Sequence, residues 1–99
     1  MRVIYASAAR LDLLEIAAWI AEDNPVRAES FAEELIQACD KLADMPHRFQ
    51  LVPGHEESGI RRRPWGNYLI FYRVGDDSVQ ILHVLHGARD YEKILFPDD

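Results

Sequence analysis

The last third of the chain contains two β-prone runs separated by a short connection, and this pattern constrains the fold most strongly. The runs are Tyr68–Tyr72 and Val79–Leu85, both rich in aromatic and β-branched residues. The turn-forming segment Gly75–Ser78 lies between them. A connection this short predicts an antiparallel hairpin, and its apolar face needs helices to cover it.

Two amphipathic segments in the first half of the chain provide that cover. The first repeats apolar residues at helical spacing, at Leu13, Ile16, Ala17 and Ile20. The second does the same at Ala28, Phe31, Leu35, Ala38 and Leu42. Ser7 is expected to cap a helix that begins at Ala8, and Asn24 to cap a second helix that begins at Pro25. Because the connection is short, the two helices should form an antiparallel hairpin.

The remaining segments complete the predicted fold. Arg2–Tyr5 is a short β-prone run, residues 47–58 form a loop, and the β pattern resumes at Ile60. We therefore expect one α+β domain, residues 1–99, with the order β-α-α-β-β-β. An N-terminal strand and a helical hairpin would pack with a three- to four-stranded antiparallel sheet. Tyr91–Phe96 is expected to form either one helical turn or an extended tail.

Composition excludes several classes of protein. The net charge is −6 and the only lysines are Lys41 and Lys93, so general binding to nucleic acid is not expected. No apolar run is long enough to span a membrane, and we expect a soluble, cytoplasmic protein. Cys39 is the only cysteine, which excludes an intrachain disulfide, and its place in a helical apolar stripe predicts core packing.

No catalytic or metal-binding constellation is legible in the sequence. His83 and His86 are three residues apart on one strand, so their side chains should point to opposite faces. We expect neither a metal nor a cofactor. The adjacent carboxylates Glu56 and Glu57 can supply a general base, although a solvated pair in a loop explains them better.

Four arginines and no acidic residue occur between Ile60 and Arg73. If this segment is a strand, Arg62 faces away from Arg61 and Arg63. Two interpretations stay open: a charged edge strand that resists aggregation, or an anion-recognition surface to which Arg73 and Arg89 contribute. Trp65 follows this stripe near a turn, and an exposed tryptophan beside arginines is typical of a binding anchor.

The most specific features of the chain are the Asp23-Asn24-Pro25 turn and the terminal run from Val84 to Asp90. Weaker matching positions include Asp12, Leu13, Ile16, Ile20, Ala28, Phe31, Leu42, Ala43, Met45, Pro46, Gly59, Ile60, Arg61, Tyr68, Ile70, Tyr72 and Ile81. In this combination the chain resembles the ParE toxins, a branch of the RelE/ParE superfamily of type II toxin–antitoxin systems. The resemblance covers nearly the whole chain.

The resemblance implies a partner and a target. The partner would be a ParD-like antitoxin that forms a hetero-oligomer with the toxin, a heterotetramer or larger. The toxin would contact operator DNA only indirectly, through this antitoxin. The target would be DNA gyrase, inhibited by binding and without a catalytic residue, in a system associated with plasmid stabilisation. The expected target or partner contacts are Arg61, Arg63, Trp65, Arg73, His86, Arg89, Asp90 and Tyr91. The expected antitoxin groove contains Trp19, Phe31, Leu35 and Ile36.

Two alternative functions accompany this hypothesis, and two structural alternatives concern the tail. The chain can be a ribosome-dependent mRNA endonuclease of the RelE type, although it lacks the clustered lysines of that branch. It can also be a degenerate family member that only binds antitoxin. Within the tail, Asp90 can pair with Arg89 or a neighbouring arginine and only shape the tail. Ile94, Leu95 and Phe96 can close the core and make no contact with a target.

Overall fold

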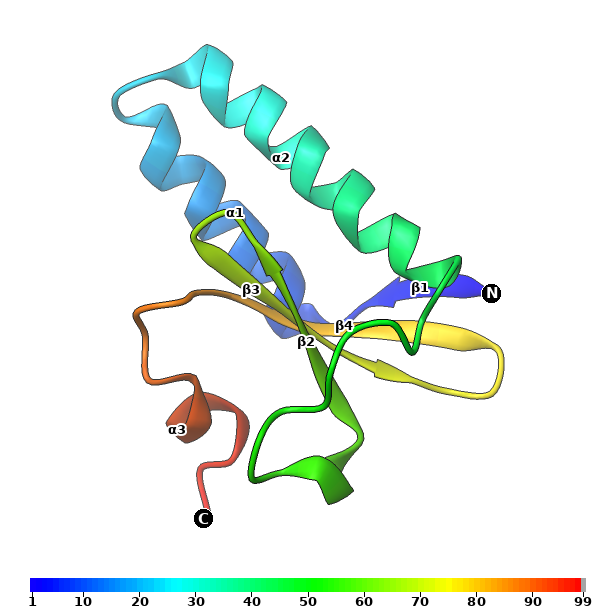
Figure 1. Cartoon of the computed structure of the whole chain (residues 1–99). Coiled ribbons are helices and arrows are strands. Elements are labelled where there is room, and N and C mark those ends of the chain that lie inside the picture. Colours follow the sequence, from blue (N-terminus) through cyan, green and yellow to red (C-terminus); the bar gives the residue numbers. More distant parts are fainter. Residues whose placement is uncertain (99) are drawn as a thin grey trace.

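The computed structural model describes residues 1–98 and places a helical hairpin and a short C-terminal helix on opposite faces of one sheet (Figure 1). The elements are β1 (Arg2–Tyr5), α1 (Ser7–Ala21), α2 (Pro25–Asp40), β2 (Ile60–Trp65), β3 (Tyr68–Val74), β4 (Ser78–His86) and α3 (Tyr91–Leu95). Two 3-10 turns, Lys41–Ala43 and Glu56–Ser58, lie between α2 and β2. The predicted α+β fold and its element order are confirmed.

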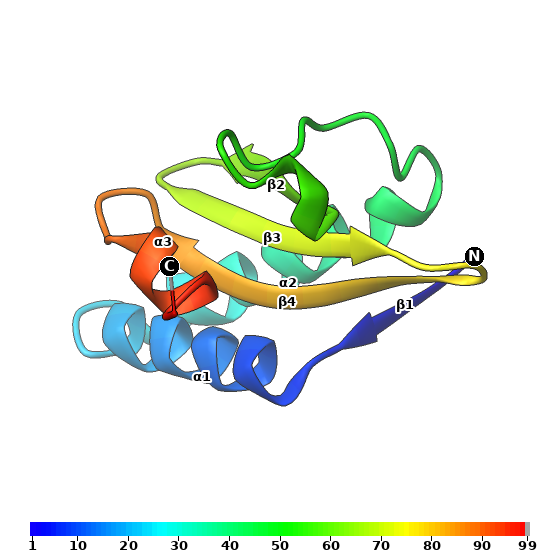
Figure 2. The same ribbon diagram turned by 90° about the horizontal axis from the view of Figure 1, so that it is seen from below.

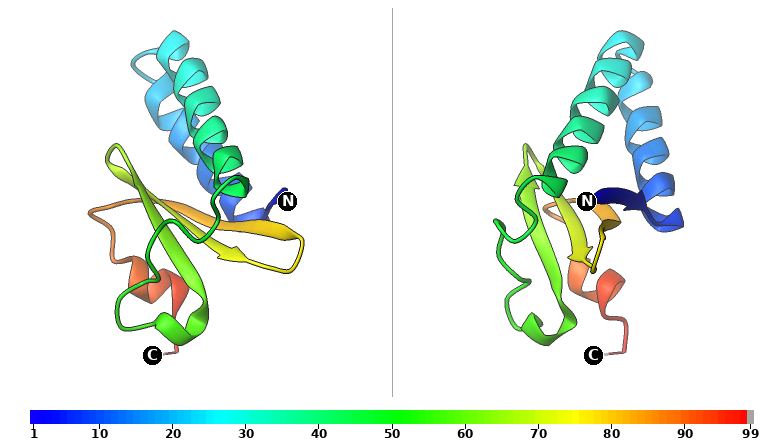
Figure 3. Two further views of the ribbon diagram at one scale, coloured as in Figure 1. Left: turned by 45° about the vertical axis from the view of Figure 1, so that its right-hand side comes forward. Right: turned by 90° about the vertical axis from the view of Figure 1, so that its right-hand side faces the viewer.

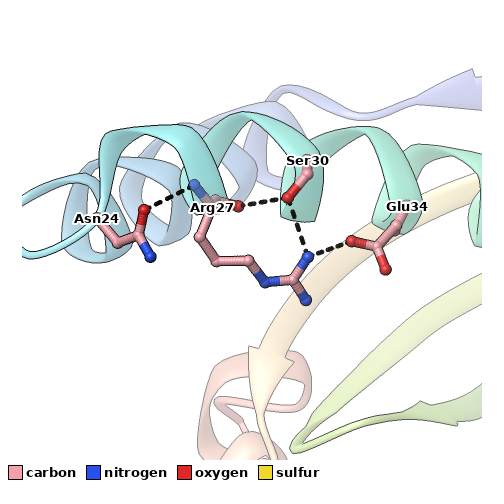
Figure 4. A network of polar contacts seen from close by, with 4 residues as sticks. All are labelled: Asn24, Arg27, Ser30 and Glu34. Atoms are coloured by element: carbon pink, nitrogen blue, oxygen red, sulfur yellow. Dashed lines mark hydrogen bonds and ion pairs between the residues drawn. The ribbon is translucent and has the colours of Figure 1, made fainter.

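The start of α2 follows from its local sequence. The side chain of Asn24 accepts a hydrogen bond of 3.0 Å from the backbone N–H of Arg27, and Pro25 occupies the first turn. Arg27 then reaches along the helix to Ser30 and Glu34 (Figure 4). The predicted cap of α1 is wrong, because the helix already includes Ser7. Ala6 is in the capping position and makes no side-chain cap.

The sheet has the strand order β1-β4-β3-β2. As predicted, β2, β3 and β4 are antiparallel, whereas the fourth strand, β1, runs parallel to β4 and pairs Val3 with Val79. Parallel neighbours need a long crossover connection. Both helices, β2 and β3 all lie between β1 and β4 in the sequence, and they provide that connection.

Gly66 allows the tight turn between β2 and β3. The cross-strand pair Trp65–Tyr68 leaves only two residues in this turn, Gly66 and Asn67. Gly66 has a φ of 57°, in the left-handed region that glycine adopts without a steric cost. The short connection then fixes the register that places Arg61 opposite Tyr72.

Each face of the sheet carries its own hydrophobic cluster. The cluster under the helical hairpin includes Ala9, Leu35, Ala38, Cys39, Leu42, Ile70, Tyr72, Val79, Ile81 and Val84. The cluster on the opposite face includes Val52, Ile60, Phe71 and Leu85, and the partly buried Tyr91, Ile94, Leu95 and Phe96 pack against it. Figure 2 shows α3 in front of β4 on this face. The expected core position of Cys39 is confirmed, and the tail forms a helical turn that closes the second cluster.

The tip of the helical hairpin stands clear of the sheet, as both views in Figure 3 show. Near this tip, Trp19 of α1 and Val26 of α2 expose most of their surface. Large apolar side chains in such a position are available to a partner. None of the helices within residues 1–98 is long and apolar enough to cross a membrane.

Candidate functional site

A groove of about 500 Å³ runs between α1 and the ends of β3 and β4. The α1 wall contains Asp12, Glu15, Ile16 and Trp19. The opposite wall contains Tyr68, Val84, His86 and Arg89. One wall thus presents carboxylates, the other presents an imidazole and a guanidinium, and apolar side chains lie on both. We refer to this site as the α1 groove.

Asp12 fixes the distance between the two walls of the α1 groove. Its Oδ2 atom accepts a hydrogen bond of 2.9 Å from the backbone N–H of Val84 and lies 2.8 Å from Nδ1 of His83. Because an ionised carboxylate only accepts hydrogen bonds, His83 is the donor. The helical periodicity places Asp12 away from the apolar stripe, yet its side chain is only 11% exposed. Its strand partners are more than 70 residues away in the sequence, so the local pattern contains no indication of this contact.

The residues predicted for the antitoxin groove do not share one surface. Trp19 is 72% exposed and lines the α1 groove, and Ile36 is 41% exposed on α2. Leu35 is only 1% exposed and belongs to the core between α2 and the sheet, so it cannot contact a partner. Phe31 is half-buried against Trp65 and Tyr68, with ring centroids 5.0 and 5.6 Å away. The apolar stripe of α2 therefore predicted core packing better than it predicted a groove.

The arginine stripe divides between the two faces of β2, as the alternation predicted. Arg61 donates to the backbone oxygen of Phe49 at 2.7 Å, on the face of the sheet that the helical hairpin covers. Arg63 lies over the ring of Phe49, with 5.1 Å between its Cζ atom and the centroid. Arg62 points to the opposite face, where it donates to the Tyr91 hydroxyl at 2.9 Å. This strand therefore presents positive charge on both faces at one edge of the sheet.

Of the contacts expected at Trp65 and Arg73, only Arg73 is exposed. The ring of Trp65 meets Phe31 edge-to-face and packs on the main core, so the prediction of an exposed tryptophan anchor is wrong. Phe31 of α2 packs against the indole, which is partly buried, and the sequence of β2 alone could not reveal this contact. Arg73 is exposed, and its Nε atom donates to the backbone oxygen of Ser58 at 3.2 Å.

The terminal run contributes two side chains to the α1 groove. His86 and Arg89 both line it, and His86 is exposed at the end of β4. Asp90 lies 3.7 Å from Lys93 and pairs with this lysine, whereas the alternative had expected an arginine as its partner. Tyr91 packs its ring on Phe71 and accepts a hydrogen bond from Arg62, so both parts of this side chain are occupied within the fold.

A family model described as the ParE toxin of the type II toxin–antitoxin system parDE matches residues 3–91. The chain belongs to the ParE toxin family. No match to a curated protein was found.

Three solved structures share the fold of this ParE family member. A chromosomal ParDE system from P. aeruginosa has a TM-score of 0.74 and 18% identity, with 87% of this chain and 95% of the other covered. The RelBE2 toxin–antitoxin complex from Mycobacterium tuberculosis has a TM-score of 0.64 and 25% identity, with 86% and 95% covered. The RelB–RelE complex from Methanococcus jannaschii has a TM-score of 0.56 and 21% identity, with 95% and 99% covered.

The buried ionisable groups of this ParE toxin lie beneath the end of α2. Burial raises the pKa of the Cys39 thiol to about 12, and the charge of Asp40 adds to the effect. Burial likewise raises the pKa of Tyr5, whose hydroxyl donates to Asp40 at 2.9 Å. Both groups are protonated at neutral pH, and an unreactive thiol is consistent with a structural role. Residues 1–98 contain no group of three or more histidine, cysteine or acidic side chains that could hold a metal ion.

Proposed function

We propose that this toxin is neutralised by a ParD-like antitoxin and inhibits DNA gyrase by stoichiometric binding, without catalysing a reaction. The family match over residues 3–91 is the observation that carries the proposal, because the matched family is that of parDE systems. The likeness of fold to a chromosomal ParDE system supports it. Gyrase as the target follows from the resemblance to ParE toxins.

The α1 groove is the proposed site of antitoxin capture. Trp19 offers a large apolar surface beside Glu15 on one wall, and Arg89 lies on the other wall. A peptide that carries an apolar side chain flanked by both signs of charge would match this lining. Because exposed aromatic side chains dominate binding energy in such sites, Trp19 should contribute more than its neighbours.

The contacts of His83 and Arg61 support a role that depends on binding. Cleavage of RNA needs a base, an acid and cations around one phosphate. The imidazole of His83 is bonded to Asp12, and the guanidinium of Arg61 is bonded to backbone oxygens of His47 and Phe49. Both groups thus have roles in the fold that explain their positions.

A supercoiling assay with purified gyrase tests the target. Increasing amounts of toxin should stop supercoiling near an equimolar ratio, as expected of a tight stoichiometric inhibitor, and added antitoxin should restore it. Gyrase that stays fully active at a large excess of toxin would refute the gyrase assignment.

A substitution at Trp19 tests the antitoxin site separately. In cells that express both proteins, Trp19→Asp should release the toxin from its antitoxin and arrest growth. Val26→Asp is the matched control, since Val26 is also highly exposed but does not line the α1 groove. Unchanged antitoxin affinity in the Trp19 variant would place capture elsewhere.

The RelE type of activity is the second candidate, and the 25% identity to the RelBE2 complex over most of both chains favours it. In this case the toxin would cleave mRNA on the ribosome, and the arginines of β2 would hold the phosphate. Discrete cuts in ribosome-bound mRNA that disappear in Arg61→Ala would establish this function and refute the non-catalytic one.

A further inference from the structure

A basic hollow of about 220 Å³ lies where the end of α2, the following loop and β2 meet. Its lining includes Lys41, Asp44, Met45, Arg48, Phe49 and Arg63. Three of these side chains are cationic and one is acidic, in a protein whose net charge is −6. We refer to this site as the basic hollow.

Phe49 holds two of the cations in place. The Cζ atoms of Arg48 and Arg63 lie 5.4 and 5.1 Å from the centroid of its ring, which is the range of cation–π attraction. The backbone of Phe49 is fixed in turn, because Arg61 donates to its oxygen at 2.7 Å. A pre-positioned pair of guanidinium groups loses less side-chain entropy when it binds a ligand.

The positive charge continues around the edge of the sheet. A neighbouring hollow of about 360 Å³ is lined by Arg48, Phe49, Gln50, Arg62 and Pro64. Arg62 points to the opposite face of β2 from Arg63, so Arg48 stands between the two hollows. Among the described residues, no acidic side chain lines the second hollow.

Lys41, Arg48 and Arg63 form no ion pair within residues 1–98. Arg63 donates to the backbone oxygen of Pro64 at 2.8 Å, which uses only one of its five N–H groups. Clustered charge without internal partners produces a local positive potential that attracts anions.

We propose that the basic hollow binds the carboxylates of an acidic peptide segment. Arginine N–H groups match carboxylate oxygens in pairs, and three cations around one depression suit two or more successive Asp or Glu side chains. The recognition must act through side chains. Segment 50–52 already pairs with β2, and Pro64 has no N–H to offer to an added strand.

A nucleic acid fits the basic hollow less well than a peptide. Single strands are held by aromatic rings on which bases stack. The ring of Phe49 carries arginine guanidinium groups, and Trp65 packs against Phe31, so neither ring offers a stacking platform. The overall negative charge also opposes a polyanion that extends beyond the basic hollow.

Fluorescence anisotropy with the full chain and a fluorescein-labelled peptide of Asp and Glu tests the site. A peptide of Asn and Gln, a single-stranded RNA and a single-stranded DNA are compared at the same salt concentrations. We expect the acidic peptide alone to bind well, with an affinity that falls as salt rises. Arg48→Ala should weaken binding about tenfold or more, since a hydrogen bond between two charged groups contributes on this scale.

Arg10→Ala is the matched control, because it removes the same charge from an exposed position on α1. Circular dichroism confirms that both variants fold. Three results would overturn the proposal: no binding of the acidic peptide, tighter binding of RNA or DNA, or an equal loss in Arg10→Ala, which would indicate diffuse charge attraction. Arg48→Lys should retain part of the affinity, because it keeps the charge and loses the fork geometry.

In the cell an acidic segment of the toxin's target is the expected occupant, and this step rests on the proposed function. The role of the basic hollow and the gyrase assignment can be refuted separately. Peptide binding without gyrase inhibition would support the basic hollow and refute only the gyrase assignment. Gyrase inhibition that Arg48→Ala leaves unchanged would overturn the role of the basic hollow in target contact.

Discussion

The carboxylate of Asp12 should be one of the most stabilising polar groups of this toxin. It joins α1 to β4 through the Val84 N–H at 2.9 Å and the His83 imidazole at 2.8 Å. A hydrogen bond to a charged group contributes about 1.5–3 kcal/mol, and a buried N–H left without a partner costs about 1–3 kcal/mol. Because His83 is partly exposed, its hydrogen bond to Asp12 contributes less to stability than a fully buried one would. We therefore expect Asp12→Ala to lower the free energy of unfolding by about 3 kcal/mol.

Urea unfolding followed by circular dichroism measures this loss. For a domain of this size, 3 kcal/mol corresponds to a fall of about 12–24 °C in the melting temperature. Asp12→Asn keeps one acceptor for Val84 and should lose about half as much. Glu15→Ala is the matched control, since Glu15 is exposed one turn along the helix and should change stability by less than about 0.5 kcal/mol.

A double-mutant cycle with His83→Ala isolates the pair. A coupling energy of about 1–2 kcal/mol is expected for two groups in direct contact. If Asp12→Ala costs less than about 1 kcal/mol, or no more than Glu15→Ala, then the carboxylate does not hold the helix to the sheet and the reasoning is refuted.

Three further predictions concern the core and a turn. Because Cys39 has a pKa raised from 9.0 to about 12, its unfolded form loses a proton first as pH rises. The free energy of unfolding should therefore fall between pH 9 and 12 in urea titrations, and the raised pKa values of Tyr5 and Tyr72 should add to the fall. Phe96→Ala should cost about 2–3 kcal/mol in urea unfolding, because Phe96 stacks on His55 with centroids 3.8 Å apart and packs on the second cluster. Gly66→Ala should cost about 1 kcal/mol by the same measurement, since its φ is 57°.

Each of these predictions has its own control. Cys39→Ala should reduce the alkaline loss, and an unchanged pH profile in that variant would contradict the assignment to the thiol. Lys93→Ala changes a highly exposed side chain of α3, the helix that precedes Phe96, and should leave stability unchanged, in contrast to Phe96→Ala. Gly66→Asn should be tolerated better than Gly66→Ala, because asparagine enters the left-handed region more readily.

Much of the fold could be predicted because its determinants are local. Asn24 followed by Pro25 is a local signal that favours the start of a helix, and the cap is present as expected. Alternation along β2 correctly separated Arg62 from Arg61 and Arg63, since neighbouring side chains of a strand point to opposite faces. The apolar stripe of α2 likewise identified Cys39 as a core residue.

Apart from the cap of α1, the errors arose where a residue's surroundings come from distant segments. Trp65 is near a turn in sequence, but α2 brings Phe31 against its ring. Leu35 belongs to an apolar stripe that suits either a groove or a core, and only the position of the sheet decides between them. The parallel pairing of β1 with β4 depends on a crossover that includes both helices.

By itself, the sequence determined the secondary structure, its order and the side on which most strand residues lie, because helical and strand periodicity act between near neighbours. The tertiary structure alone decided which chemical groups meet. It placed Asp12 against His83, and Arg48 and Lys41 beside Arg63. Such contacts between distant residues depend on the angle at which the helices pack on the sheet and on the path of the loops. Packing of the whole core sets that geometry, and no local pattern along the chain records it.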